Sequence, residues 1–212
     1  MIRNLRTASH LMEQFKRRLF ALEDHVFEIR HRIDVGGAVS HENLVSTNGD
    51  SLPHATAYNA VWCRNLRELF REARKTGVAF RNFVDVGAGK GKACFYASSA
   101  MSFDKIVGIE FSKSLIEIAK RNQTRYRATN IDFQLADAAQ YLLPAGNALI
   151  FLFNPFDEVI LNAFIENNLK HFGENRSVIA YANDVHRKLL TARGFETLFR
   201  SQTRKISLYG FS

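Results

Sequence analysis

A glycine loop is the first feature of this chain whose residue types and spacing could do chemistry. Gly87, Gly89 and Gly91 occupy every second position in the run NFVDVGAGKGKACFY, which begins at Asn82. Glycine is the least costly residue where the backbone must adopt positive φ or let a ligand approach its amides. A strand that leads into such a loop, with a helix N-terminus behind it, offers free N–H groups to a polar or anionic ligand. The loop therefore predicts where a cofactor binds.

The spacing of this loop separates it from two other nucleotide-binding loops. The dinucleotide fingerprint G-x-G-x-x-G needs a glycine where this chain has Lys92. The P-loop pattern G-x-x-x-x-G-K-[ST] would need a glycine in place of Val86 and a hydroxyl side chain in place of Ala93. What remains is an acidic residue, Asp85, followed by G-x-G-x-G.

Further candidate residues follow the later predicted strands. Glu110 ends the next strand, nineteen residues after Gly91. A carboxylate there has two acceptor oxygens and could bind both hydroxyls of a ribose. The third strand leads into Asp137 and Ala138, and the fourth into Asn154, Pro155 and Phe156.

The order and spacing of these features resemble motif I and the following strands of the class I S-adenosylmethionine (SAM)-dependent methyltransferases. From Asn82 to Ser212 the layout is similar to small bacterial-type members whose substrates are generally unassigned. The resemblance implies SAM as the cofactor, with Asp85 at its methionine end and Glu110 on its ribose. The loop backbone would approach the methionine and sugar portions (Gly87, Ala88, Gly89 and Gly91), and other residues would meet the adenine (Phe111, Asp137 and Ala138).

Asn154, Pro155 and Phe156 are the predicted catalytic residues, because they resemble a shortened [D/N/S]-P-P-[Y/F/W] motif of amino-group methyltransferases. In that motif a side-chain oxygen and the proline carbonyl accept hydrogen bonds from an NH2 group, and the aromatic ring stacks on a planar substrate. The second proline is missing here, and an asparagine near this place also occurs in seven-strand lysine methyltransferases. The acceptor could therefore be a protein lysine or a nucleobase, and Asn-Pro is also ordinary turn chemistry.

Two other functions stay open at this point: a small-molecule methyltransferase, and a non-catalytic SAM-fold module that forms dimers. The net charge of +8 and the pI near 9.7 favour a nucleic-acid or acidic protein partner, although many soluble proteins are equally basic. The His and Cys residues show no metal-ligand spacing, so no metal is expected. No apolar run could span a bilayer and no signal peptide is evident, so we expect a cytoplasmic protein without a membrane partner.

The N-terminal segment Leu5–Ile33 has the pattern of a helix. Its apolar residues are spaced alternately three and four apart, which is a heptad seam (Met12, Phe15, Leu19, Leu22, Val26, Ile29 and Ile33). Such a helix either packs on its own domain or pairs with a second subunit as a homodimer. The segment Asp34–Tyr58 is predicted to be a lid over the cofactor, and a second helix is expected from His54 to Gly77. His54 and Tyr58 are candidates for contact with the substrate or for packing of the lid.

The rest of the chain alternates strands and helices, which predicts an α/β fold. The expected class is a doubly wound, mostly parallel, seven-stranded Rossmann-like sheet with an antiparallel C-terminal hairpin and an N-terminal helical extension. We divide the chain into an N-terminal helix and lid-like loop (1–58) and a methyltransferase domain (59–212). Expected strands are 83–86, 106–110, 131–135, 149–153 and 177–181, with helices at 92–100, 114–125, 158–172 and 184–193. A capping box of Ser114 and Glu117 is expected to begin the second of these helices.

Overall fold

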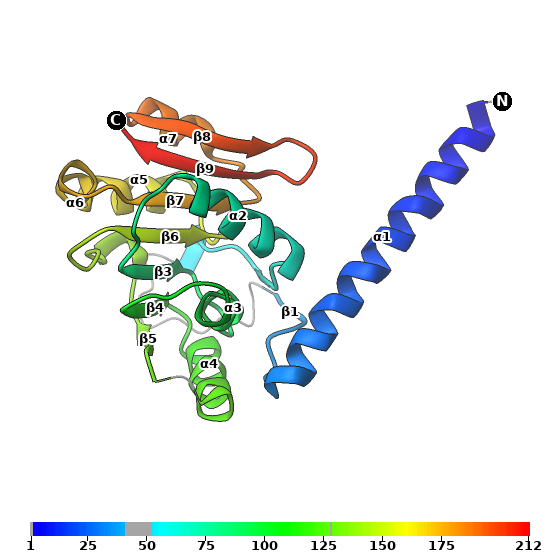
Figure 1. The fold of residues 1–212 in the computed structure, drawn as a ribbon, viewed down its shortest axis with the longest axis horizontal. Helices are drawn as coiled ribbons and strands as arrows, with labels where there is room; N and C mark the ends of the chain where they lie inside the picture. The colour runs from blue at the N-terminus through cyan, green and yellow to red at the C-terminus, as the bar shows by residue number, and fades with distance from the viewer. Residues whose placement is uncertain (1, 41–51, 128) are drawn as a thin grey trace.

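A seven-stranded sheet forms the centre of the protein (Figure 1). The computed structural model describes residues 2–40, 52–127 and 129–212. The strand order is β5-β4-β3-β6-β7-β9-β8; the first five strands are parallel, and β9 runs antiparallel to both β7 and β8. The strands are β3 (Asn82–Val86), β4 (Lys105–Glu110), β5 (Ile131–Leu135), β6 (Ala148–Leu152), β7 (Val178–Ala182), β8 (Phe195–Ser201) and β9 (Ile206–Phe211). The predicted fold class, including the C-terminal hairpin, is confirmed.

Helices cover both faces of this sheet. Residues that alternate along β3 and β6 belong to two separate apolar layers: Phe83 and Leu149 to one, Val84 and Ile150 to the other. A strand buried on both faces has no polar side, which explains the continuous apolar runs in the sequence. Phe83 and its layer pack against α2 (Cys63–Lys75), α3 (Lys92–Ala100) and α4 (Lys113–Tyr126), and the other layer packs against α5 (Glu158–Asn167), α6 (Leu169–Glu174) and α7 (Arg187–Ala192).

The strand order of the sheet reverses between β3 and β6, which makes this position a topological switch point. The chain adds β4 and then β5 on one side of β3, and then returns to place β6 on the other side. Val86, the last residue of β3, lies opposite Ile109 of β4 and Leu152 of β6, so the carboxyl ends of the three strands are level. In open α/β sheets a ligand binds at the carboxyl ends of the strands beside such a switch point.

The predicted helix from His54 begins only at Cys63, so the first part of that prediction is wrong. Residues 55–62 contain no helix. They include β2 (Tyr58–Asn59), which pairs with β1 (Ala38–Val39), and Ala55 forms an isolated bridge with Phe156. The Thr56 N–H is bonded to the Pro155 carbonyl at 3.0 Å. This long-range contact competes with helix formation and overrides local propensity.

Two smaller predictions also need correction. The expected capping box is absent: Ser112 is the N-cap of α4 without a side-chain cap bond, and the Ser114 hydroxyl instead lies 3.1 Å from the Ser112 hydroxyl. The single helix expected over 158–172 is divided at Asn168, which is buried. Its side-chain amide donates to the carbonyls of Tyr141 and Phe164 and accepts from the Leu143 N–H, so it is held by tertiary hydrogen bonds at the break.

Helix α1 (Ile2–His31) extends away from the sheet at its N-terminal end and meets the rest of the protein at its C-terminal end (Figure 1). The helix ends where Arg32 adopts φ 56°. Ile33 is buried in the same apolar layer as Phe83. The last residue of the predicted seam is therefore part of the core. The predicted division at residue 58 falls inside β2, and residues 41–51 of the predicted lid lie outside the described residues.

Candidate active site

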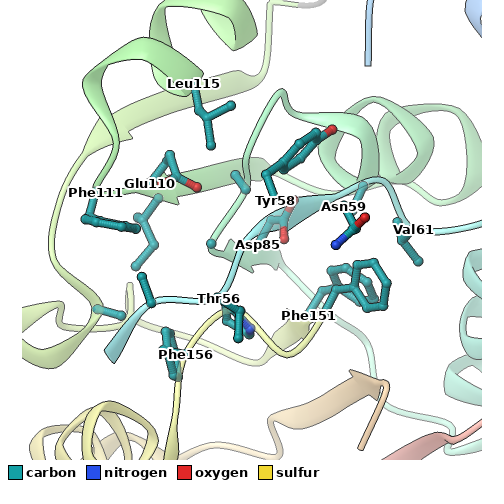
Figure 2. Close-up of a pocket in the computed structure, with 18 of the residues that line it drawn as sticks. Thr56, Tyr58, Asn59, Val61, Asp85, Glu110, Phe111, Leu115, Phe151 and Phe156 are labelled. Carbon is teal, nitrogen blue, oxygen red and sulfur yellow. The ribbon is translucent and has the colours of Figure 1, made fainter. Parts of the chain in front are cut away.

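A cleft lies at the carboxyl ends of β3, β4, β5 and β6, beside the switch point (Figure 2). Residues 55–61 line it from the opposite side; we call residues 54–61 the covering segment. Most of the predicted site residues line this cleft: Tyr58, Asp85, Gly87, Ala88, Glu110, Phe111, Asp137, Ala138, Pro155 and Phe156. Gly89, Gly91, Asn154 and His54 are beside it but are not among its lining residues.

Glu110 holds the glycine loop to the end of β4. It is 4% exposed, and its Oε2 accepts a 2.8 Å hydrogen bond from the Gly89 N–H. Its Oε1 accepts a second 2.8 Å bond from the Ser112 N–H at the start of α4. Burial raises the pKa of the Glu110 carboxyl above its ordinary value, although these N–H groups lower it. Each oxygen of this carboxylate retains acceptor capacity for a ligand in the cleft.

Asp85, near the end of β3, is a second buried carboxyl group in the cleft. It is 3% exposed, and the Cys94 thiol lies 3.7 Å from its Oδ2. Burial raises the pKa of Asp85, the Cys94 thiol lowers it and the charge of Glu110 raises it, so that the pKa lies at about 8. In the part of the chain that the structure describes, neither Asp85 nor Glu110 forms an ion pair with Lys or Arg. Buried carboxylates without a cation are stabilised by a ligand that brings positive charge and hydrogen-bond donors.

The glycines of the loop are needed for packing as well as for backbone conformation. Gly87 has φ 82°, and a Cβ there would lie 2.3 Å from the Cβ of Pro155. Gly89 has φ 54°, and a Cβ there would lie 2.2 Å from Cε2 of Tyr58. Both positions combine the left-handed region with a contact that no side chain could fit. The loop therefore lies directly against the covering segment and the end of β6.

Polar contacts hold the covering segment at Tyr58, near its middle, and at His54, its first residue. The Tyr58 hydroxyl donates to the Val35 carbonyl at 2.7 Å. Lys90 donates to the Gly36 carbonyl at 2.7 Å, and its ammonium lies 5.8 Å from the centre of the Tyr58 ring. At the start of the segment, His54 Nδ1 lies 2.6 Å from Asp157 Oδ2.

Asp157 binds both His54 of the covering segment and the first turn of α5. Its Oδ1 accepts from the N–H groups of Val159 and Ile160, so it also caps the helix. Burial raises the pKa of the Asp157 carboxyl, but the hydrogen bonds from His54 and from these N–H groups outweigh burial and leave the pKa lowered. The sequence indicated neither the partner of His54 nor a role for Lys90.

Asn154 and Pro155 sit where β6 ends. Asn154 has φ 44°, a left-handed conformation in which asparagine is enriched, and its Oδ1 accepts from the Tyr181 hydroxyl at 3.4 Å. The backbone carbonyl of Asn154 accepts from the Thr56 hydroxyl, and that of Pro155 accepts from the Thr56 N–H. Phe156 is 7% exposed and belongs to the core layer that packs on α5.

At the other end of the cleft, the side chains suit a flat apolar group. Phe111, Leu115 and Ala138 line this part, and Figure 2 shows Phe111 and Leu115 on either side of Glu110. Asp137 Oδ1 accepts from the Ala139 N–H at 2.9 Å and so caps the short helix η3 (Ala138–Gln140). The backbone around Asp137 is therefore fixed by local hydrogen bonds.

Several cleft residues were not identified from the sequence. Thr56, Asn59 and Val61 were missed because their segment was assigned to a helix. Lys92 also lines the cleft; it is 3% exposed and forms an ion pair of 2.7 Å with Asp24 of α1. The sequence showed Lys92 only as the residue that breaks the dinucleotide fingerprint, and no local pattern linked it to the N-terminal helix.

Neither a metal site nor a membrane span is found in the described residues. No group of three or more His, Cys, Asp or Glu side chains within 2–40, 52–127 and 129–212 is arranged to hold a metal ion. Over the same ranges, every helix is too short or too polar to cross a bilayer.

Comparison with known proteins identifies the fold and the family. The family model described as "Methyltransferase domain" matches residues 81–205. A ribosomal protein L11 methylase from Lactobacillus delbrueckii subsp. bulgaricus superposes with a TM-score of 0.50 at 14% identity, over 69% of this chain and 77% of that one. A putative RNA methyltransferase from Pyrococcus horikoshii gives the same score and identity, over 69% of this chain and 81% of that one. Among curated proteins, none matches the chain significantly.

The cleft residues fit the cofactor that this family implies. SAM carries a sulfonium and an ammonium group beside a ribose and an adenine. Asp85 and Glu110 are buried carboxyl groups that would be stabilised by such positive charge and by hydroxyl donors. The family match covers more than half of the chain, and the sheet order is that of the fold. The chain belongs to the methyltransferase-domain family and is a class I SAM-dependent methyltransferase.

Proposed function

We propose that this methyltransferase transfers the methyl group of SAM to an amine nitrogen, and that the acceptor is a primary alkyl amine of the lysine type. The observation that carries the proposal is the position of Asn154 at the end of β6, with its side-chain oxygen bonded only weakly, at 3.4 Å, to the Tyr181 hydroxyl. An amide oxygen accepts two hydrogen bonds, so this atom has capacity for an amine N–H.

Two further features support an alkyl amine over a nucleobase. Phe156 lines the cleft but is only 7% exposed because its ring packs into the core, so it offers little of the free face on which a base would stack. The covering segment lies across the acceptor end, since Thr56 binds the backbone carbonyls of both Asn154 and Pro155. An acceptor end covered in this way favours a slender alkyl chain over a fused ring.

In the proposed site the cofactor would lie along the strand ends. Glu110 would accept hydrogen bonds from the ribose hydroxyls, and Asp85 would face the methionine end. Asp137, Ala138 and Phe111 would contact the adenine. SAM supplies a methyl group on a sulfonium, which leaves as a neutral thioether.

The chain itself would position the acceptor. Asn154 Oδ1 would accept an N–H of the neutral amine and direct the nitrogen lone pair at the methyl carbon, which is a positioning effect. As the N–C bond forms and the S–C bond breaks, the nitrogen becomes positively charged and then releases a proton to water. The Tyr181 hydroxyl, whose pKa burial raises, stays protonated and keeps donating to Asn154.

The test is methyl transfer from radiolabelled SAM to three probes. These are a mixture of lysine-containing peptides, the same peptides with every lysine acetylated, and a single-stranded RNA. We expect label only on the unmodified peptides. Label on the RNA and not on the peptides would reject the lysine-type acceptor.

Asn154→Ala should lower kcat/KM for the peptides at least about tenfold, since one oriented hydrogen bond is lost in the transition state. It should leave the affinity for S-adenosylhomocysteine within about twofold, because Asn154, beside the cleft, would contact the acceptor and not the cofactor. Asn183→Ala is the matched control: Asn183 follows β7 and has a similar φ of 53°. If both variants lose activity equally, Asn154 does not position the acceptor.

A further inference from the structure

Helix α1 presents an apolar stripe to solvent. Six of the seven side chains predicted to form the seam are between 47% and 64% exposed: Met12, Phe15, Leu19, Leu22, Val26 and Ile29. Isolated exposed apolar residues are ordinary, but a continuous stripe of this length on one helix marks an interaction surface. The N-terminal end of α1 extends away from the domain, which leaves room for a partner (Figure 1).

The other side of the same helix is used for docking on its own domain. Asp24 forms an ion pair with Lys92 at 2.7 Å and accepts from the Cys63 N–H at 2.9 Å. Glu23 pairs with Arg67, and the Phe27 ring lies 5.9 Å from that of Tyr96. Asp24 lies two residues from Leu22 and from Val26, which is about 200° around the helix at 3.6 residues per turn. Docking therefore leaves the stripe uncovered.

From these two faces we infer that the stripe pairs with the same stripe of a second copy, so that the protein is a homodimer joined by a coiled coil of α1 helices. The apolar residues of the stripe alternate strictly three and four positions apart, which is an average repeat of 3.5 residues. At this repeat two supercoiled helices keep their apolar side chains in contact along their whole length. A helix that packs on a globular surface usually shows a wider apolar face. In the sequence, Leu5 continues the same spacing one heptad before Met12.

The area of the stripe is sufficient for a specific interface. Six half-exposed side chains of this size expose roughly 80–100 Å² each. Two such stripes would bury about 1,000–1,200 Å² in total, before the flanking residues are counted, which is the lower range of specific protein interfaces. The dimer is therefore expected to dissociate at low concentration.

The charges beside the stripe distinguish a second copy from a membrane surface. Exposed arginines flank it (Arg18 and Arg30), whereas Glu23 and Asp24 are engaged with the domain. Two copies bring like charges together, so added salt should strengthen the dimer by screening them. Binding to an anionic lipid surface would instead weaken with salt.

Sedimentation of the full chain over roughly a hundredfold range of concentration tests the inference. We expect a monomer–dimer equilibrium that shifts toward dimer in high salt. Leu22→Lys, and separately Phe15→Lys, should raise the dissociation constant at least about a hundredfold, because each change affects both helices of the pair. Lysine is a good helix former, so α1 itself should persist.

The matched control is Leu142→Lys, since Leu142 is 67% exposed but lies outside the stripe. It should dimerise like the unmodified chain, and all three variants should bind S-adenosylhomocysteine equally. A chain that stays monomeric at every concentration overturns the inference. Dimerisation unaffected by Leu22→Lys would also overturn it, and so would a monomer that binds phosphatidylserine vesicles through Leu22 and is released by salt.

Discussion

Replacing Glu110 by alanine should abolish most of the affinity for the cofactor while leaving the protein folded. Glu110 is 4% exposed at the end of β4, and both of its oxygens are bonded to backbone N–H groups at 2.8 Å. In the proposed complex the same carboxylate would accept the two ribose hydroxyls. Hydrogen bonds to a charged group contribute about 1.5–3 kcal/mol each, so two of them correspond to about 3–6 kcal/mol.

The expected loss of affinity is at least about a hundredfold, taking the lower end of that range because water can enter the space left by the side chain. The free energy of unfolding should change by only about 1–2 kcal/mol. Two N–H groups lose their acceptor, but a buried carboxyl group with a raised pKa is also removed, and these effects oppose each other. Glu110→Gln keeps one acceptor oxygen, so its affinity for the cofactor should lie between those of the unmodified chain and Glu110→Ala.

Isothermal titration calorimetry with S-adenosylhomocysteine measures this directly. Asp132→Ala is the matched control, because Asp132 is a carboxylate on the neighbouring strand β5 that pairs with Lys105 outside the cleft. The affinity of the Asp132→Ala variant for S-adenosylhomocysteine should stay within about twofold of that of the unmodified chain. If the dissociation constant of Glu110→Ala for S-adenosylhomocysteine is within about threefold of that of the unmodified chain, the proposed ribose contact is refuted.

Three more outcomes follow from the same geometry. The raised pKa of Asp85, about 8, means that the folded state holds a proton that the unfolded state has already lost. Unfolding midpoints in urea, measured without ligand, should therefore fall as pH rises from about 4 to about 8, and Asp85→Asn should flatten that fall; an unchanged slope would contradict it. Gly89→Ala puts a Cβ 2.2 Å from the tyrosine ring of the covering segment, at a residue whose φ is 54°. This variant should lose both stability and affinity for the cofactor. Gly173→Ala, where the space around the Cβ is open, should lose neither. Asp24→Asn leaves the 3% exposed ammonium of Lys92 without its charge partner and should destabilise the fold by about 3 kcal/mol in urea titration; a loss below about 1 kcal/mol would contradict that ion pair.

The parts of the fold that depend on local pattern could be predicted from the sequence. Continuous apolar runs identified β3, β6 and β7 within about one residue, because strands buried on both faces have no polar positions. The final hairpin was also predicted, and its turn occupies residues 202–205, between β8 and β9. Turn position depends on pairing register, which the Thr197/Phe199 irregularity shifts.

The covering segment could not be predicted for a different reason. Its conformation depends on Thr56 bonding to Asn154, which lies 98 residues further along the chain. Helix propensity alone favoured a helix there, and nothing local to the segment indicates the end of β6 as its partner. Contacts between distant segments of this kind are invisible to periodicity.

Much of the candidate site was nevertheless identified, because the ends of parallel strands meet at one edge of the sheet. Asp85, Glu110 and Asp137 lie far apart in sequence and all line one cleft. Lys92 was missed, since its partner Asp24 belongs to the N-terminal helix and no spacing rule relates the two. The seam of α1 was predicted from its heptads, whereas the sequence could not say which side of the helix docks on the domain.

A crystal structure of the chain with S-adenosylhomocysteine would show whether the cleft at the strand ends is the cofactor site. We expect the ribose hydroxyls within about 3 Å of the Glu110 carboxylate, the amino-acid end beside Asp85, and the sulfur on the side of the cleft next to Asn154. A ligand bound elsewhere, or bound in the cleft with its ribose away from Glu110, would contradict it.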